Sequence, residues 1–156
     1  MLRVLHVTAT GLTLGVSLGI AFLLVPRSRR LGDAGAMRSA LTSVLRVVDP
    51  LLIGLLGVLV MTGAYSVTGL KQTLGADFFE VVQRYLALKL GLAFLVVMTG
   101  TWLAMGLGHR LVRAEGWGDP PDARAIGSMT TRLQAAALLL AALLVTTIVV
   151  SLRRGG

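Results

Sequence analysis

The sequence contains no cysteine among its 156 residues. This absence excludes disulfide bonds, thiolate nucleophiles, iron–sulfur clusters and cysteine-ligated zinc. Charged residues are also scarce at 14%, and aromatic residues reach only 5%, whereas 55% of the residues are hydrophobic. A soluble globular domain carries more charge and less apolar content. The composition therefore favours an integral membrane protein.

The charged residues occur in clusters, and the apolar segments between them approach the ~20 residues that cross a bilayer. Strand-like alternation is absent, and an open strand cannot satisfy its backbone hydrogen bonds in lipid, so each segment is predicted to be a helix. We expect one transmembrane domain over residues 1–156, an all-α, up-down four-helix bundle. The predicted spans cover about residues 5–25, 49–67, 83–107 and 128–152.

Two helix starts bear on this division. The first apolar run follows Arg3 and is too long for the core of a signal peptide, so we expect it to be retained as a helix. Asp49 and Pro50 are typical of a helix start, because aspartate caps the first turn and proline fits the first helical position. The second span is predicted to begin there, and no acidic residue is expected within a span.

Lysine and arginine are distributed unevenly between the two sides of the bundle. The first and third loops with their flanks hold nine of them: Arg27, Arg29, Arg30, Arg38, Arg46, Arg110, Arg113, Arg124 and Arg132. The other side holds five: Arg3, Lys71, Arg84, Arg153 and Arg154. Because positively charged loops stay in the cytoplasm, we expect a protein of the cytoplasmic (inner) membrane with loops one and three cytoplasmic and both termini outside. The net charge of +8 then reflects topology and not nucleic-acid binding.

The first span combines a polar face with a glycine face in the stretch LHVTATGLTLGVSLG. At 100° per residue, the polar residues share one face: His6, Thr10, Thr13 and Ser17. The glycines share the opposite face: Gly11, Gly15 and Gly19. Small residues at this spacing let helices approach closely, which predicts a tight contact with another span or with another subunit of a homo-oligomer or larger membrane complex. The polar face is predicted to point into the bundle, although its hydroxyls could simply bond carbonyls of their own helix.

Ionisable residues inside spans are rare and mark functional sites. His6 is therefore a candidate ligand, and the alternative is a hydrated histidine at the membrane surface. Lys89 is the one charged residue well inside a predicted span, at a depth similar to that of His6, and Tyr85 shares its face. Lys89 either extends to the membrane surface or pairs with an anion such as a haem propionate.

A second stripe follows the third span: Met98, Trp102, Met105 and His109. Thioether and imidazole ligands suit Cu(I), and the alternative is ordinary packing against the core or lipid. His6 and His109 are expected at opposite faces of the membrane, about 30 Å apart, so one chain cannot bring both histidines to one iron.

Several short motifs carry a resemblance to a known family. The chain opens its first span with LHV, closes it with VPRSRRLG, opens the second with DP and carries YLALKLGLAFL in the third. In this it resembles the HemJ-type protoporphyrinogen oxidases and the related CopD and DUF2269-type membrane proteins. The resemblance implies a b-type haem associated with His6 and Lys89, and a Pro–Arg pair at Pro26 and Arg27.

The leading functional prediction is a haem-associated or redox-linked membrane protein. His6 would be the axial ligand of haem b, with Lys89, Arg27 and Tyr85 near the cofactor, and the resemblance implies an oxidoreductase of the protoporphyrinogen oxidase type. One alternative is an accessory subunit that docks through Gly11, Gly15 and Gly19. The other is a copper-handling protein that uses Met98, Met105 and His109.

Overall fold

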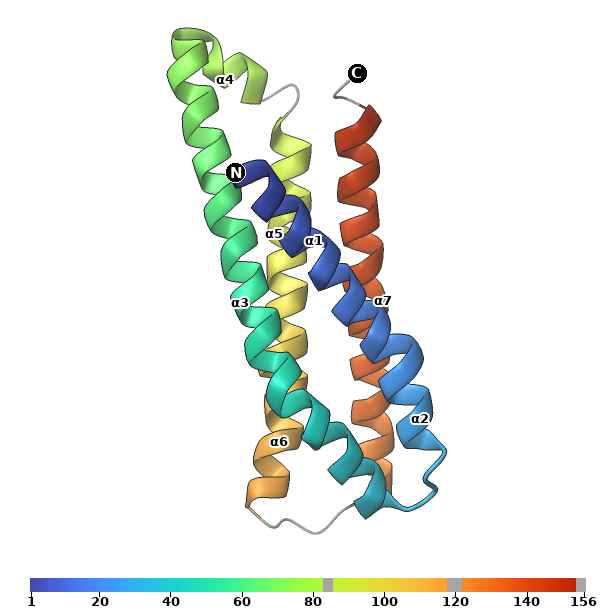
Figure 1. The fold of residues 1–156 in the computed structure, drawn as a ribbon. Coiled ribbons are helices and arrows are strands. Elements are labelled where there is room, and N and C mark those ends of the chain that lie inside the picture. Colours follow the sequence, from blue (N-terminus) through green and yellow to red (C-terminus); the bar gives the residue numbers. More distant parts are fainter. Residues whose placement is uncertain (83–85, 118–121, 154–156) are drawn as a thin grey trace.

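A computed structural model of the protein describes residues 1–82, 86–117 and 122–153, which form helices joined by short turns (Figure 1). In chain order the elements are α1 (Leu2–Gly19), η1 (Ile20–Leu24), α2 (Val25–Arg29), α3 (Ala34–Leu74), η2 (Gly75–Asp77), α4 (Phe78–Val81), α5 (Ala87–Thr101), η4 (Trp102–Gly108), α6 (His109–Gly116) and α7 (Ala123–Arg153). Successive elements join into four rods that are long and apolar enough to cross a membrane: Leu2–Arg29, Ala34–Glu80, Ala87–Gly116 and Ala123–Arg153.

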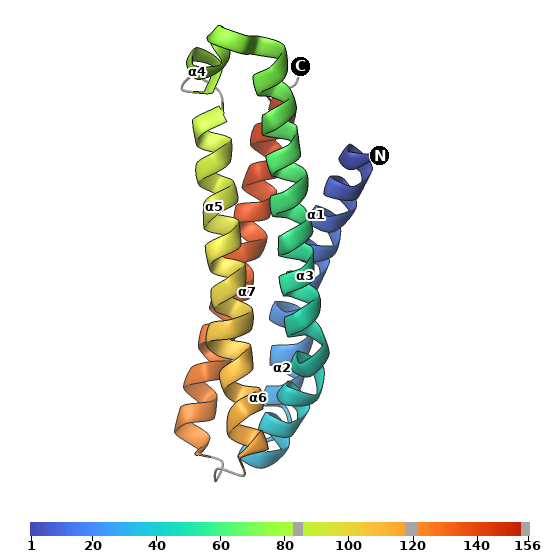
Figure 2. The ribbon, with the colours of Figure 1, turned by 90° about the vertical axis from the view of Figure 1, so that its left-hand side faces the viewer.

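The four rods form the predicted up-down bundle, in which α1 and α5 each pack against both α3 and α7. The start of α1 and the end of α7 lie at the same end of the bundle, and we call this the terminal end (Figures 1 and 2). The opposite end, formed by α2, α6 and the starts of α3 and α7, is called the basic end. Most arginines belong to its elements: Arg27, Arg29, Arg38, Arg46, Arg110, Arg113, Arg124 and Arg132.

Leucine side chains fill the bundle mainly in the half nearer the basic end. The largest fully buried ones are Leu41, Leu45, Leu52, Leu103, Leu111, Leu133 and Leu140. Toward the terminal end α1 leans outward (Figure 2), and Val4 and Val7 remain 70% and 69% exposed. The bundle is therefore tightly packed at one end and opens between α1 and its neighbours at the other.

The helix start predicted at Asp49 is wrong. Helix α3 begins fifteen residues earlier, where the Asp33 side chain caps it by accepting a 2.7 Å hydrogen bond from the backbone N–H of Ala36. Pro50 lies inside this helix, where it removes one backbone hydrogen bond. The helix continues because its buried stripe stays in phase across the proline, from Leu45 to Leu52. Asp49 is thus an acidic residue within a membrane-spanning helix.

Two of the rods contain a π-helical segment, η1 in the first and η4 in the third. A π-turn widens the helix and disturbs the regular bonding of its carbonyls. In η1 the side chain of Gln134 on α7 donates a 3.1 Å hydrogen bond to the carbonyl oxygen of Ala21. This bond satisfies a carbonyl that is fully buried with its residue and ties α7 to the irregular part of the first rod.

Removing this bond gives a first prediction. We expect Gln134→Met to lower the free energy of unfolding in detergent by about 1 kcal/mol, because it leaves the Ala21 carbonyl without its partner. Thr146→Val is the matched control, since the Thr146 hydroxyl bonds only the Ala142 carbonyl of its own helix. Equal unfolding midpoints for the two variants in a denaturant titration would show that Gln134 does not tie the rods together.

Candidate functional site

The candidate site is built around His6, on the inward face of α1 near the terminal end. Its Nδ1 lies 2.7 Å from Oγ1 of Thr62 on α3. The Thr62 hydroxyl has a single proton, which it donates to the Val58 carbonyl at 2.7 Å. With that proton on the Val58 carbonyl, Thr62 Oγ1 accepts from His6 and Nδ1 carries the proton of the neutral ring, which is the tautomer that we assign. The consequence is an unprotonated Nε2, the form of histidine that binds metals.

Three residues of the polar stripe of α1 face inward as predicted, whereas His6 is exposed. Thr13 and Ser17 are fully buried and Thr10 is half-buried. Each hydroxyl donates to a carbonyl one turn earlier on its own helix, at 2.7–2.8 Å. The simpler explanation of these hydroxyls is therefore confirmed, and their oxygens keep lone pairs that face the bundle. Among the described residues, only His6 of this stripe has a side-chain hydrogen bond to another helix.

A groove runs between α1 and α7 beside His6. It has a volume of about 390 Å³ and is lined by residues that include His6, Thr10, Gly11, Thr147 and Ser151. A Cβ atom at Gly11 would meet nothing within 4 Å, so the wall of the groove there is bare helix backbone. Small-molecule sites have volumes of roughly 300–1,000 Å³. The groove can therefore hold a flat organic molecule close to the imidazole.

A smaller cavity of about 110 Å³ extends the groove into the bundle, and it shares His6, Thr10 and Thr147 with it. Ala93 of α5 lines this inner cavity, and Lys89 lies one turn earlier on α5, about 6 Å along the helix axis. Lys89 is half-buried, and it makes no ion pair with any other residue that the structure describes. Lys89 lines neither the groove nor the inner cavity, so its approach to His6 stays a prediction.

The other candidate residues are not part of this site. Arg27 belongs to α2, 21 residues after His6, which places it about 30 Å away along the rod. His109 begins α6 at the basic end and is exposed, so the two histidines lie at opposite ends as expected. Tyr85 lies outside the described residues.

The methionine stripe of the third rod lies on its outer surface. Met98, Trp102 and Met105 are 54%, 50% and 59% exposed, and His109 is exposed as well. These side chains therefore lie where contact with lipid, one of the alternatives to a copper site, would place them. Within residues 1–82, 86–117 and 122–153, no three histidine, aspartate or glutamate side chains gather into a group suited to a metal ion.

The glycine face of α1 is open. A Cβ atom at Gly11, Gly15 or Gly19 would meet nothing within 4 Å, so the tight contact predicted for this face is not made with another described span. Contact with another subunit stays a prediction.

The sequence did not reveal two partly buried carboxylates toward the basic end. Asp49 packs against Gly108 at the end of η4, and its Oδ2 is buried without a hydrogen-bond partner among the described residues. One to two turns further toward the basic end, Thr42 donates a short hydrogen bond to Glu115, and Arg46 lies 3.6 Å from the same carboxylate. Arg46 is 58% exposed, so that ion pair contributes little to stability.

The sequence analysis missed two polar residues that bond another helix, Gln134 and Thr62, and one of them could have been found from sequence. Gln134 is a lone amide in an apolar run, which signals a buried hydrogen bond. Thr62 carried no such signal. Other threonines of the same helix bond carbonyls of their own helix, and nothing in the sequence sets Thr62 apart from them.

Comparison with known proteins gives no relatives: no family model, no curated protein and no solved structure matches the chain.

Proposed function

We propose that this protein is a haem-binding protein of the inner membrane, with His6 as the axial ligand in the groove between α1 and α7. The observation that carries the proposal is the 2.7 Å hydrogen bond between His6 Nδ1 and Thr62 Oγ1, in which we assign His6 as the donor. Metal-ligating histidines characteristically donate their other ring N–H to a fixed acceptor, which orients the ring and frees the second nitrogen. His6 is prepared in this way beside a groove of suitable size.

The surroundings of His6 suit a porphyrin. Gly11 leaves a bare surface for a flat ring, and Thr10, Thr147 and Ser151 supply acceptors at the groove wall. Lys89 would offer its ammonium group to a propionate, whereas Arg27 is too distant to do so. When bound, haem would supply one-electron chemistry, which agrees with the redox activity implied by the resemblance to HemJ-type proteins.

The orientation is part of the proposal. The arginine-rich basic end would face the cytoplasm, since positive charge is retained on that side. His6, its groove and Lys89 would then lie in the outer half of the membrane, where haem or its substrate could enter sideways from the lipid between α1 and α7.

The visible spectrum of the protein tests the haem proposal. After expression in haem-replete cells and purification in mild detergent, we expect a Soret band that is lost in His6→Ala and retained in His109→Ala. His109 is the matched control because it is the second histidine of the chain and lies at the opposite end. A wild-type protein without a Soret band, or a full band in His6→Ala, would overturn the proposal.

We propose as a second role that the face of α1 around Gly15 docks against another subunit, since Gly15 lines neither the groove beside His6 nor the other cavities described. Gly15→Leu has room in the isolated chain, so it should leave the unfolding midpoint unchanged while it lowers the mass of the complex isolated in mild detergent. Gly57→Leu is the control, because Gly57 on α3 is equally free of neighbours. An unchanged mass would exclude this face as an interface. The copper alternative stays a prediction that no observation on the described residues favours.

A further inference from the structure

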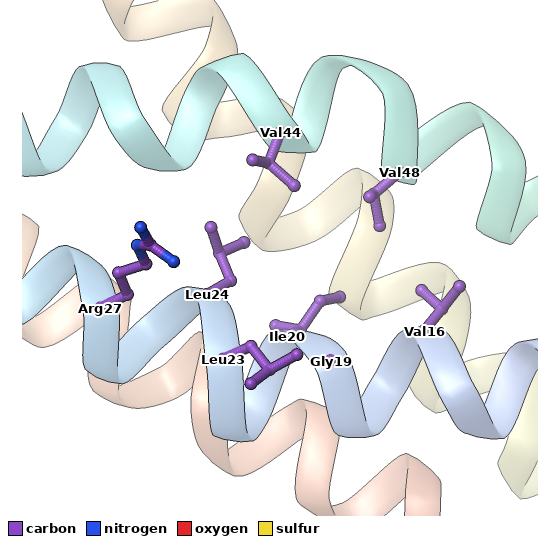
Figure 3. Close-up of a pocket in the computed structure, with 8 residues that line it drawn as sticks. All are labelled: Val16, Gly19, Ile20, Leu23, Leu24, Arg27, Val44 and Val48. Carbon is purple, nitrogen blue, oxygen red and sulfur yellow. The ribbon is translucent and has the colours of Figure 1, made fainter.

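An apolar slot lies between the first rod and α3, near the basic end (Figure 3). Its volume is about 340 Å³, and its walls come from apolar residues of α1, η1 and α3, among them Val16, Leu24, Val44 and Val48. Arg27 is the one charged residue that lines it. In Figure 3 the Arg27 guanidinium lies beyond Leu24, at the end of the row of apolar side chains.

The slot exists because side-chain volume is missing on the first rod. Gly19 lines it, and a Cβ atom there would meet nothing within 4 Å. Leu23 and Val44 flank the slot and are 72% and 40% exposed, so it opens on the outer surface of the bundle. In a membrane this surface faces lipid, and an empty apolar slot there would be filled by hydrocarbon.

Positive charge gathers where the slot ends. Arg27 also lines two adjoining cavities of about 280 and 710 Å³, and the larger one includes Arg30. Neither arginine forms an ion pair with a described carboxylate. Arg29, in contrast, donates to Thr131 at 3.1 Å. Arg27 and Arg30 are therefore available for an external anion, and the nearby Ser43 hydroxyl offers a further polar contact.

The length of the slot matches one leaflet. From Val16 to Arg27 the chain advances eleven residues, about 16 Å along the helix, and half of the hydrocarbon core measures about 15 Å. We propose that this slot is a binding site for one anionic phospholipid. Its acyl chain lies along Val16, Gly19 and Val44, and its phosphate contacts Arg27 and Arg30.

Charge complementarity favours a phospholipid over a second copy of this chain. Basic pockets between transmembrane helices bind anionic headgroups, whereas the corresponding surface of another copy would bring the same two arginines close to Arg27 and Arg30. The site is separate from His6, which lies at the other end of the rod, so it does not depend on the proposed haem.

Native mass spectrometry of the delipidated protein tests the proposal. The protein is titrated with phosphatidylglycerol and with phosphatidylcholine of the same acyl chains. We expect one phosphatidylglycerol to bind with about fivefold preference for each arginine engaged. Arg27→Gln should lower the preference for phosphatidylglycerol about fivefold. Gly19→Leu should abolish binding of both lipids, because its side chain fills the slot. Arg124→Gln, an exposed arginine at the same end, is the control, and circular dichroism checks that each variant is folded.

Four results would overturn the proposal. These are equal affinities for the two lipids, an Arg27→Gln variant that behaves like Arg124→Gln, release of the lipid by millimolar inorganic phosphate alone, and a lipid-free dimer that Gly19→Leu dissociates. The third would indicate a plain anion site, and the fourth a slot covered by a second copy. Arg30→Gln repeats the charge test should Arg27→Gln fail to fold.

Discussion

Replacing Gly108 by leucine is expected to lower the free energy of unfolding by about 3 kcal/mol, because overpacking a closely packed interior forces neighbours out of place. A Cβ atom at this position would overlap the carboxylate of Asp49. That carboxylate has no free space to move into at low cost, since its Oδ2 is already buried. The effect is measured as the shift in the unfolding midpoint during a denaturant titration in detergent.

Two further variants assign this effect to the Asp49 contact. Gly57→Leu introduces the same side chain on α3, where a Cβ atom meets nothing within 4 Å, and it should leave stability unchanged or slightly raised. Combining Gly108→Leu with Asp49→Ala should recover about 2 kcal/mol as a coupling energy between the two positions. Additive losses in the double variant would mean that Gly108 is constrained by something other than Asp49.

Thr62→Val is expected to weaken haem binding 10- to 100-fold, the usual cost of removing an outer partner of a metal-ligating histidine. Valine keeps the shape of threonine but offers no acceptor to His6 Nδ1, so the ring loses both its orientation and its preferred tautomer. The measurement is a haem titration of the apoprotein followed in the Soret region. This prediction rests on the proposed haem site.

Thr68→Val is the matched control for that titration. It makes the same substitution on the same helix, and the Thr68 hydroxyl donates to the Ala64 carbonyl of its own helix at 3.0 Å. Its haem affinity should equal that of the wild type. If Thr62→Val also binds haem with wild-type affinity, the hydrogen bond to His6 does not prepare the ligand.

Much of the fold follows from sequence because lipid leaves few choices: apolar runs of this length must be helical and must pack together. The faces of the first span followed too, since the helical period alone places Thr13 and Ser17 opposite Gly15. The start of the second span was missed at Asp49 because local capping signals were weighed without tertiary packing. Leu41 and Leu45 are buried against the bundle, and this packing extends α3 across Pro50.

The site was less accessible from sequence. His6 and Lys89 could be named because charge and imidazole are rare in spans, and their depths could be matched from flanking arginines. The partner of His6 could not, because choosing Thr62 among the hydroxyls of α3 requires the rotation and lean of α1. Arg27 was grouped with His6 through the resemblance, yet the straight run of the first rod separates them by its full length.

The proton positions on His6 test the account most directly, and they need no cofactor. Nitrogen-15 NMR of histidine-labelled apoprotein can resolve both ring nitrogens, and His109→Gln leaves a single histidine to observe. At a pH where the ring is neutral, we predict a protonated Nδ1 and an unprotonated Nε2, with loss of this preference in Thr62→Val. A ring protonated at Nε2 would contradict the account, because Nδ1 would then accept from Thr62 and the hydrogen bond would not leave Nε2 free for iron.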